Sequence, residues 1–456
     1  MAKDMTKGKP LGLILSFTIP LLIGNLFQQL YSMADTFIVG RTIGVTALAA
    51  VGSTGSIMFL ILGFAQGLTA GLAIPLAQKF GAKDEKGVRQ SFFVSLLIAA
   101  CVSLVLTVFS VIFCRLILET MRTPVEIIDQ SESYLRVILA GLSTSVAFNL
   151  LSNILRALGD SKTPLYFLVI ACIMNIILDI VFIVVFKIGV AGAGFATIIS
   201  QAFSAIACLV YIKRRLPILH FKREDLKVSN GFVMAHVRIA FPMAFQTSII
   251  AIGALSIQIT LNQLGANSVA AYTAAQKIDQ LAILPLMSFG VTMATYTAQN
   301  FGAKLYQRIW DGVTTCIKLS LTFSVAIGIF LILFSPQLIT LFVGPGQEDV
   351  VQLGRWYFIT NSSMYFLLSL LFIYRYTLQG LGKSFIPTLA GIMELVMRMI
   401  AAIFLSQIFG FVGATMANPL AWLGAVIPLS YTYYSYKHKY IKKHKQKIEK
   451  QPNPNN

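Results

Sequence analysis

Two acidic side chains lie within long uncharged stretches of the sequence. Asp35 and Asp179 each follow directly on a long run of uncharged residues. Tyr31 lies four residues before Asp35, and Asn175 lies four residues before Asp179, so each pair shares one face of a helix. A carboxylate in hydrocarbon costs about 2.5–3.5 kcal/mol on insertion scales, so it persists where it is paired, neutralised or in contact with water.

These residues predict a polar cluster that binds a positive ion. At a rise of about 1.5 Å per residue, both acids fall in the outer half of a helical bundle, at the depth where Thr197 begins a later helix. Two neighbouring carboxylates cannot both ionise at low cost in a low dielectric, so we expect the cluster to bind a proton near neutral pH. Sodium also suits these oxygens, and a pair of neutral structural carboxyl groups is the alternative. The candidate cation-coupling residues are Asp35, Asp179, Asn175, Thr197, Tyr31, Asn149 and Asn153.

A second set of charged residues occurs late in the chain. Glu394 and Arg398 are four residues apart, which predicts an ion pair on one helix. Asp279 and Arg398 are each expected near mid-depth of their helices. This set is interpreted as a buried ion-pair network, or as a group in which Asp279 or Glu394 attracts a cationic substrate.

The composition indicates a membrane protein. Of 456 residues, 56% are apolar and 12% are charged, whereas soluble domains carry about 25% charged residues. A soluble multidomain enzyme, a disordered chain and a coiled coil are therefore excluded. The net charge of +18 comes from basic residues between apolar blocks, which is typical of cytoplasmic loops and not of a nucleic-acid-binding surface.

No motif for a metal site or for catalysis is present. The five cysteines fall in apolar stretches without a CxxC pair, and the four histidines show no HxxxH or HExxH spacing. GxxxxGK[ST] is also missing, so ATP is not implied. We expect no cofactor beyond the coupled proton or sodium ion, and we expect a protein that is not an enzyme. An intramembrane enzyme is the alternative from another class, but it requires paired catalytic groups.

Uncharged runs, divided at Gly and Asn clusters, predict twelve membrane helices. The predicted spans are 12–36, 46–76, 91–115, 132–156, 164–186, 190–212, 238–262, 269–297, 313–335, 352–379, 387–407 and 411–435. Lys and Arg concentrate in alternate connections and in the tail KHKYIKKHKQKIEK, whereas the opposite connections are acidic. Both termini are therefore expected in the cytoplasm, with the basic tail touching anionic lipid.

The chain also repeats itself. QKFGAK at 78–83 recurs as QNFGAK at 299–304, and ALGDSKTP at 157–164 corresponds, at nearly the same offset, to GLGKSFIP at 380–387. Each half thus has six helices and the same orientation, so the halves should be related by a pseudo-twofold axis along the membrane normal. We predict an amino-terminal lobe at 1–215, a connecting loop at 216–235, a carboxy-terminal lobe at 236–436 and a tail at 437–456, with a cleft between the lobes.

The segment QQLYSMADTFIVGRTIGVTALAAVG at 28–52, the segment RALGDSKTP and the two QxFGAK repeats resemble the multidrug and toxic compound extrusion (MATE) transporters. The resemblance covers almost the whole chain. It implies twelve helices in two lobes, and Asp35, Asn175, Asp179 and Thr197 match the amino-lobe cation cluster of the bacterial and archaeal branch that resembles DNA-damage-inducible protein F. Some members carry acids on the seventh and tenth helices, where this chain has Gln246 and no acid.

The resemblance implies an antiporter in a bacterial-type plasma (inner) membrane. It would export organic cations or amphiphilic compounds in exchange for protons or sodium, by rocking of the two lobes. Gln246, Asp279, Glu394 and Arg398 are candidates for the substrate cleft. We expect small organic substrates and membrane lipid as partners, no nucleic acid, and a monomer. A lipid-linked precursor flippase of the same superfamily is the alternative, with Arg375 and Arg398 as candidates for binding pyrophosphate.

Overall fold

The computed structural model describes residues 4–449, and no β-strand occurs among them. Packing divides the helices into two compact units. The first unit contains Leu15–Ala251 and the residues before Gly8, and the second contains Gly8–Ile14 and the residues from Ile252 onward. The prediction of an all-α protein with two helical lobes is confirmed.

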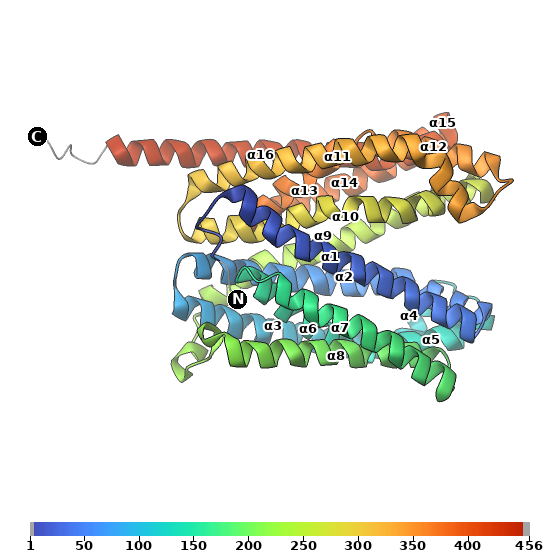
Figure 1. Ribbon diagram of the computed structural model, residues 1–456, viewed down its shortest axis with the longest axis horizontal. Helices are drawn as coiled ribbons and strands as arrows, with labels where there is room; N and C mark the ends of the chain where they lie inside the picture. The colour runs from blue at the N-terminus through green and yellow to red at the C-terminus, as the bar shows by residue number, and fades with distance from the viewer. Residues whose placement is uncertain (1–3, 450–456) are drawn as a thin grey trace, which may run out of the picture. The chain divides into compact units, whose positions relative to one another are not determined.

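The first half of the chain contains five long apolar helices and one bent pair of helices, six spans in all, and Figure 1 draws them from blue to green. Uncharged segments of this length become helices because lipid offers no hydrogen bonds to the backbone. The elements are α1 (Pro10–Thr42), α2 (Val45–Gly81), α3 (Glu85–Ile112), α4 (Cys114–Thr120), α5 (Val125–Ala140), α6 (Leu142–Ala157), α7 (Lys162–Asp179), the π-helical η1 (Ile180–Val185), α8 (Val190–Arg215), and the 3₁₀ turns η2 (Pro217–Leu219) and η3 (Arg223–Leu226).

The second half repeats this order. Its elements are α9 (Asn230–Gln263), α10 (Ala266–Gly302), α11 (Tyr306–Val343), α12 (Glu348–Ser362), α13 (Tyr365–Gly380), α14 (Phe385–Ile400), the π-helical η4 (Ala401–Leu405), α15 (Ser406–Thr415) and α16 (Ala417–Glu449). Element starts recur at a nearly constant offset: α2 and α10, like η1 and η4, start 221 residues apart, and α6 and α13 start 223 residues apart. The internal repeat therefore extends to the two π-helical segments.

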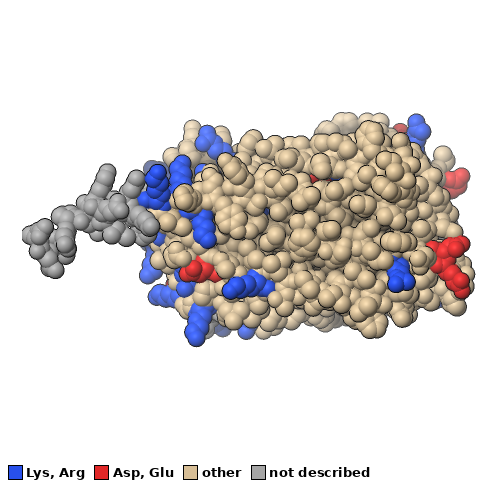
Figure 2. Space-filling view, turned by 90° about the horizontal axis from the view of Figure 1, so that it is seen from above, with Lys and Arg blue, Asp and Glu red and all other residues tan. Residues whose placement is uncertain are grey.

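Residues 4–449 contain nine helices that are long and apolar enough to cross a membrane, and eleven spans result when each bent pair is counted as one. The helix α16 is the twelfth of the fold. Lys and Arg side chains gather toward one end of the helices, and uncharged residues dominate the band between the ends (Figure 2). This distribution is that of a multi-pass membrane protein.

Two predicted spans are broken helices. The spans predicted at 132–156 and 352–379 consist of α5 with α6 and of α12 with α13, and each pair is bent by 46°. The first break lies at Gly141, where a side chain would collide with Ile198 of α8. Hydropathy does not detect such bends, because the residues on both sides of the break are equally apolar.

The predicted boundary between the last two spans coincides with a break in the helix. Two helices meet within α15 at Gly410, whose φ of +56° favours glycine, and the repeat pairs Gly410 with Gly189, the residue just before α8. The twelfth, α16, continues as a helix to Glu449, so the described part of the predicted tail is a helical extension. Residues 450–456 of that tail lie outside the described residues.

The start of α9 packs in the first unit through glycine. Gly67 and Gly71 of α2 face the α9 backbone, and a side chain at either position would collide with Ala240 or with the Met243–Ala244 backbone. Small residues permit this close approach of two helices in a membrane. The seventh helix therefore belongs in part to the first compact unit, up to Ala251.

The connection between the two halves is docked on α3. The Arg89 guanidinium donates to Asp225 of η3 at 2.7 Å, and the backbone amide of Lys222 donates to the same carboxylate at 2.9 Å. The ring of Phe221 stacks on that of Phe92, with the centroids 5.2 Å apart. The segment is thus a fitted part of the first unit and not a loose linker.

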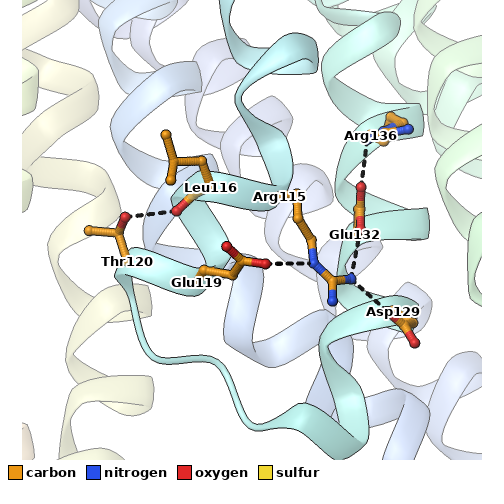
Figure 3. A network of polar contacts seen from close by, with 7 residues as sticks. All are labelled: Arg115, Leu116, Glu119, Thr120, Asp129, Glu132 and Arg136. Atoms are coloured by element: carbon orange, nitrogen blue, oxygen red, sulfur yellow. Dashed lines mark hydrogen bonds and ion pairs between the residues drawn. The ribbon is translucent and has the colours of Figure 1, made fainter.

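The acidic connection predicted between the third and fourth spans is organised around one arginine (Figure 3). Arg115 of α4 donates to Glu119 at 3.0 Å, to Asp129 at 2.6 Å and to Glu132 at 2.9 Å. Glu132 also accepts from Arg136 at 2.5 Å. These pairs join α4 to α5, although exposed ion pairs of this kind contribute little stability one by one.

We expect the docked connection to loosen when the charge of Asp225 is removed. Burial alone would raise the pKa of Asp225, but the Lys222 amide and the Arg89 guanidinium outweigh burial and hold the pKa below its ordinary value of 3.8. A lowered carboxyl pKa contributes stability above the ordinary pKa, and that stability is lost as the pH falls through the folded pKa. Amide hydrogen exchange in residues 216–229 should therefore accelerate about ten-fold in Asp225→Asn at neutral pH.

The adjacent exposed Glu224 provides the control for this measurement. Glu224→Gln should leave exchange in the connection unchanged. The parent protein should lose protection in acid, whereas Asp225→Asn should show little further loss. Equal protection in Asp225→Asn and the parent at neutral pH would contradict the docking role of this ion pair.

Candidate functional site

The two intramembrane acids of the first unit meet inside it. Asp35 lies on α1 and is 8% exposed, and Asp179 is the last residue of α7 and is fully buried. Their carboxyl groups lie within electrostatic reach of each other. The structure therefore brings together the two side chains that the sequence analysis placed at the same depth.

Three predicted partners form a hydrogen-bonded group, and its Tyr31 hydroxyl lies within electrostatic reach of both acids. Thr197 of α8 donates its hydroxyl proton to the Ala193 carbonyl at 3.0 Å. Its oxygen is then left to accept from the Tyr31 hydroxyl at 3.0 Å and from the Asn175 amide at 3.4 Å. Side chains from α1, α7 and α8 thus converge on one buried group, which we call the acid cluster: Tyr31, Asp35, Asn175, Asp179 and Thr197.

Tyr134 of α5 is a member of this neighbourhood that the sequence analysis missed. It is 4% exposed, and its hydroxyl is close enough to Asp35, Asp179 and Tyr31 to interact with their charges. The repeat carries a sequence signal for it, because Tyr134 corresponds to Tyr357 in the second half. Without the repeat, nothing in the sequence would single out Tyr134, because tyrosines are common at the ends of membrane spans.

Several oxygens of the acid cluster lack a hydrogen-bond donor. Among the described residues, no donor reaches Asp35 Oδ1, either carboxyl oxygen of Asp179, or Asn175 Oδ1, although all four atoms are buried. A buried acceptor without a donor carries a desolvation cost of about 1–3 kcal/mol, and more when it is charged. Four unmatched acceptors in one place suit a proton or a small cation.

The acid cluster also has no buried counter-charge. Among the described residues of the first unit, no lysine or arginine is as buried as Asp35 and Asp179. The other buried acids, Asp160 and Asp225, have polar partners near the ends of helices or in the connection. The two acids in the apolar interior of the first unit thus have no basic partner of equal burial among the described residues.

Asn149 and Asn153 make other contacts. Asn149 donates to the carbonyl of Ser145 in its own helix at 2.9 Å. Asn153 donates to Thr69 at 3.2 Å and accepts from Arg156 at 3.3 Å. No hydrogen bond in the described part of the chain joins either amide to the acid cluster.

The late charged residues form a compact network in the second unit. Glu394 accepts from Arg398 at 2.9 Å and from Arg375 of α13 at 2.7 Å, and all three side chains are buried. Asp279 of α10 accepts from the hydroxyls of Tyr357 and Tyr365. The predicted Glu394–Arg398 pair is present, and Arg375 is the additional partner that links α14 to α13.

The positions that correspond to the acids differ between the units. At the offsets of the sequence repeat, Asp35 corresponds to Ile257 and Asp179 roughly to Ala402, whereas the start of η4 pairs Asp179 with Ile400; all three residues are apolar. Gln246, the candidate on the seventh helix, is buried in the part of α9 that packs in the first unit. The unbalanced acids are therefore a feature of the first unit.

Comparisons with known proteins agree with this fold. The chain is 28% identical over 383 residues to "Probable multidrug resistance protein YoeA" of Bacillus subtilis, with 82% of each chain covered. It is 25% identical over 421 residues to a protein named FAD transporter of Shewanella oneidensis, with 90% of this chain and 92% of the relative covered.

A solved structure has the same fold. It is described as the outward-facing conformation of a multidrug resistance MATE family transporter, and it matches with a TM-score of 0.88 at 23% identity over 95% of this chain and 97% of that chain. The MatE family model matches twice, at residues 20–181 and 242–404, which follows the internal repeat and covers more than half of the sequence. The chain therefore belongs to the MatE family of membrane transporters, as its resemblance predicted.

Proposed function

We propose that the protein is a multidrug efflux antiporter that exports organic cations or amphiphilic compounds in exchange for protons, with sodium as the alternative ion. The observation that carries the proposal is the acid cluster, in which two buried carboxyl groups face each other without a counter-charge. Relatives named for multidrug resistance and multidrug export support the substrate class.

The electrostatics of the acid cluster support ion coupling. Two unit charges 4 Å apart repel by about 4 kcal/mol at an effective dielectric constant of 20. A single proton shared between Asp35 and Asp179 removes most of this repulsion and supplies a donor to one unmatched oxygen. The cluster thus has two states, loaded and empty, that differ strongly in energy.

The position of Asp179 connects these states to the backbone. Asp179 ends α7, and the π-helical segment η1 begins at the next residue. Such segments have a weaker hydrogen-bond pattern than an α-helix and occur often at functional sites. We infer that loading of the acid cluster changes the packing of α1 against α7 and η1, and that this change drives rocking of the lobes and release of substrate.

The driving force is sufficient for such an exchange. One charge that moves through 100 mV supplies about 2.3 kcal/mol, which corresponds to a concentration ratio of roughly fifty-fold. One or two ions per cycle are therefore enough. The distribution of Lys and Arg along the sequence favours cytoplasmic termini in a bacterial-type inner membrane.

An anionic substrate is the second candidate. The relative named FAD transporter covers most of the chain, and a lipid-linked precursor flippase would also handle a phosphate-bearing substrate. Such substrates require excess positive charge, yet the buried arginines of the second unit, Arg375 and Arg398, share Glu394. The charge balance therefore favours cationic or neutral amphiphiles.

Neutralising either acid should uncouple transport. In Asp35→Asn and Asp179→Asn the amide cannot take up a proton, so the gradient-driven accumulation ratio of an organic cation across proteoliposomes should fall to about one. Glu126→Gln, an exposed carboxyl change in the same unit, serves as the control and should behave as the parent. Full gradient-driven transport in both aspartate variants would remove the coupling assignment.

The identity of the ion should emerge from gradients imposed one at a time on the parent protein. Because two facing carboxyl groups can share one proton, we expect a pH gradient to drive transport in sodium-free proteoliposomes. A sodium gradient at equal pH should produce little transport. If only the sodium gradient drives transport, the coupled ion is sodium. The aspartate variants then test whether sodium binds at Asp35 and Asp179.

A further inference from the structure

Asp279 connects the two halves of a broken membrane span. Tyr357 lies near the end of α12, and Tyr365 is the first residue of α13. The Tyr357 hydroxyl donates to Asp279 Oδ2 at 2.9 Å, and the Tyr365 hydroxyl donates to Asp279 Oδ1. One carboxylate on α10 therefore holds both sides of the 46° bend between α12 and α13.

This arrangement suits an ionised carboxylate. Asp279 is 8% exposed, Tyr357 is 1% exposed and Tyr365 is fully buried, so water contributes little. Each carboxyl oxygen has its own hydroxyl donor, whereas a protonated carboxyl would offer a donor to a hydroxyl that already donates. Hydrogen bonds to a charged acceptor are about twice as strong as neutral ones.

The formal charges of the second unit balance when Asp279 is ionised. Among its described residues, the buried charged side chains are Arg375, Arg398, Glu394 and Asp279, and their charges sum to zero. The ring of Tyr272 packs edge-on against that of Tyr357, with the centroids 5.2 Å apart, and its hydroxyl lies within electrostatic reach of Arg398 and Asp279. Without the charge of Asp279, one buried positive charge would remain uncompensated.

The broken span of the first unit, α5 with α6, has no carboxylate at the position that corresponds to Asp279. In the register of the repeat, Asp279 corresponds to Met58, Tyr357 to Tyr134, and Tyr365 to Leu142. Met58 packs against the apolar cluster that contains Tyr134. Only the second unit therefore has a carboxylate that accepts hydrogen bonds from both sides of its broken span. Among the described residues, that unit has no pair of buried acids without a basic partner.

We propose that Asp279 is a positioning residue for transport: an ionised carboxylate that fixes the α12–α13 bend through two tyrosine hydroxyls and completes the charge balance around Arg375, Glu394 and Arg398. It does not carry the coupled ion. The proposal rests on the proposed transport function for its rate measurements, and on packing alone for its stability measurements.

The hydrogen bonds from the two tyrosines to Asp279 also position Arg375, which belongs to the ion-pair network with Glu394 and Arg398. Arg375 lies ten residues after Tyr365 on α13, and it reaches Glu394 of α14. A shift of α13 at the bend would therefore move one guanidinium of the network. Asp279 acts on transport through the tyrosines and this helix, and not through contact with the ion.

The test uses purified full-length protein in proteoliposomes with a fluorescent organic cation. The variants are Asp279→Asn, Tyr357→Phe with Tyr365→Phe, and all three changes together, with exposed Asp311→Asn as the control. Asp279→Asn and the double tyrosine variant should each lower the maximal rate about ten-fold, which corresponds to the loss of a charged hydrogen bond. The triple variant should be no slower than Asp279→Asn alone, because all three changes remove the same contact.

Two further readouts distinguish positioning from ion binding. The pH at half-maximal rate should be unchanged in Asp279→Asn, whereas Asp35→Asn and Asp179→Asn change the pH dependence. The apparent melting temperature should fall in Asp279→Asn and recover in part in Asp279→Glu. The same non-additivity should appear in the melting temperatures of the single and combined variants.

Two outcomes would overturn the proposal. A changed pH profile or ion stoichiometry in Asp279→Asn would make Asp279 an ion carrier. The other outcome is that the double tyrosine variant has the transport rate and melting temperature of the parent while Asp279→Asn transports slowly. That result would show that Asp279 does not act by holding the α12–α13 bend. If the parent shows no gradient-driven transport, the proposed function fails, yet the melting temperatures still test whether Asp279 holds the bend.

Discussion

The structure depends on how charge is accommodated where water is scarce. Ionised side chains inside a membrane cost several kcal/mol unless a partner, a proton or water compensates them. The second unit uses fixed partners, because its two buried arginines and two buried acids sum to zero. The first unit leaves Asp35 and Asp179 facing each other without a basic partner of equal burial. Fixed partners therefore meet this cost in the second unit, whereas the two acids of the first unit have no basic partner of equal burial among the described residues.

Duplication followed by divergence explains this division. The helices and even the π-helical segments recur in the same order and at a nearly constant offset, since the apolar pattern that forms them tolerates many substitutions. Polar positions do not recur in the same way. Asp35 corresponds to buried Ile257, and Asp279 corresponds to Met58. A shared scaffold thus carries two acids without a buried basic partner in one unit and a charge-balanced set in the other.

Close packing sets which segments belong to each unit. Gly67 and Gly71 admit the start of α9 to the first unit, and the Arg89–Asp225 pair holds the connection on α3. The boundary between the compact units is consequently not the connection itself. The chain passes between the units within α1, at Ile14, and within α9, at Ala251, beyond the segment that packs on α2.

The sequence by itself determined the class of protein, the internal repeat and the apolar helices, because hydropathy and spacing are local properties of the chain. It also predicted the five residues of the acid cluster, since helical spacing places Tyr31 with Asp35 and Asn175 with Asp179. Only the tertiary structure decided which residues from different helices meet. These contacts depend on how each helix is rotated and where it bends, and the residue spacing within a single helix reveals neither. Examples are Tyr134 near the acids, Arg375 with Glu394, and the two tyrosines with Asp279. For the same reason Asn149 and Asn153, at a suitable spacing, make their hydrogen bonds elsewhere.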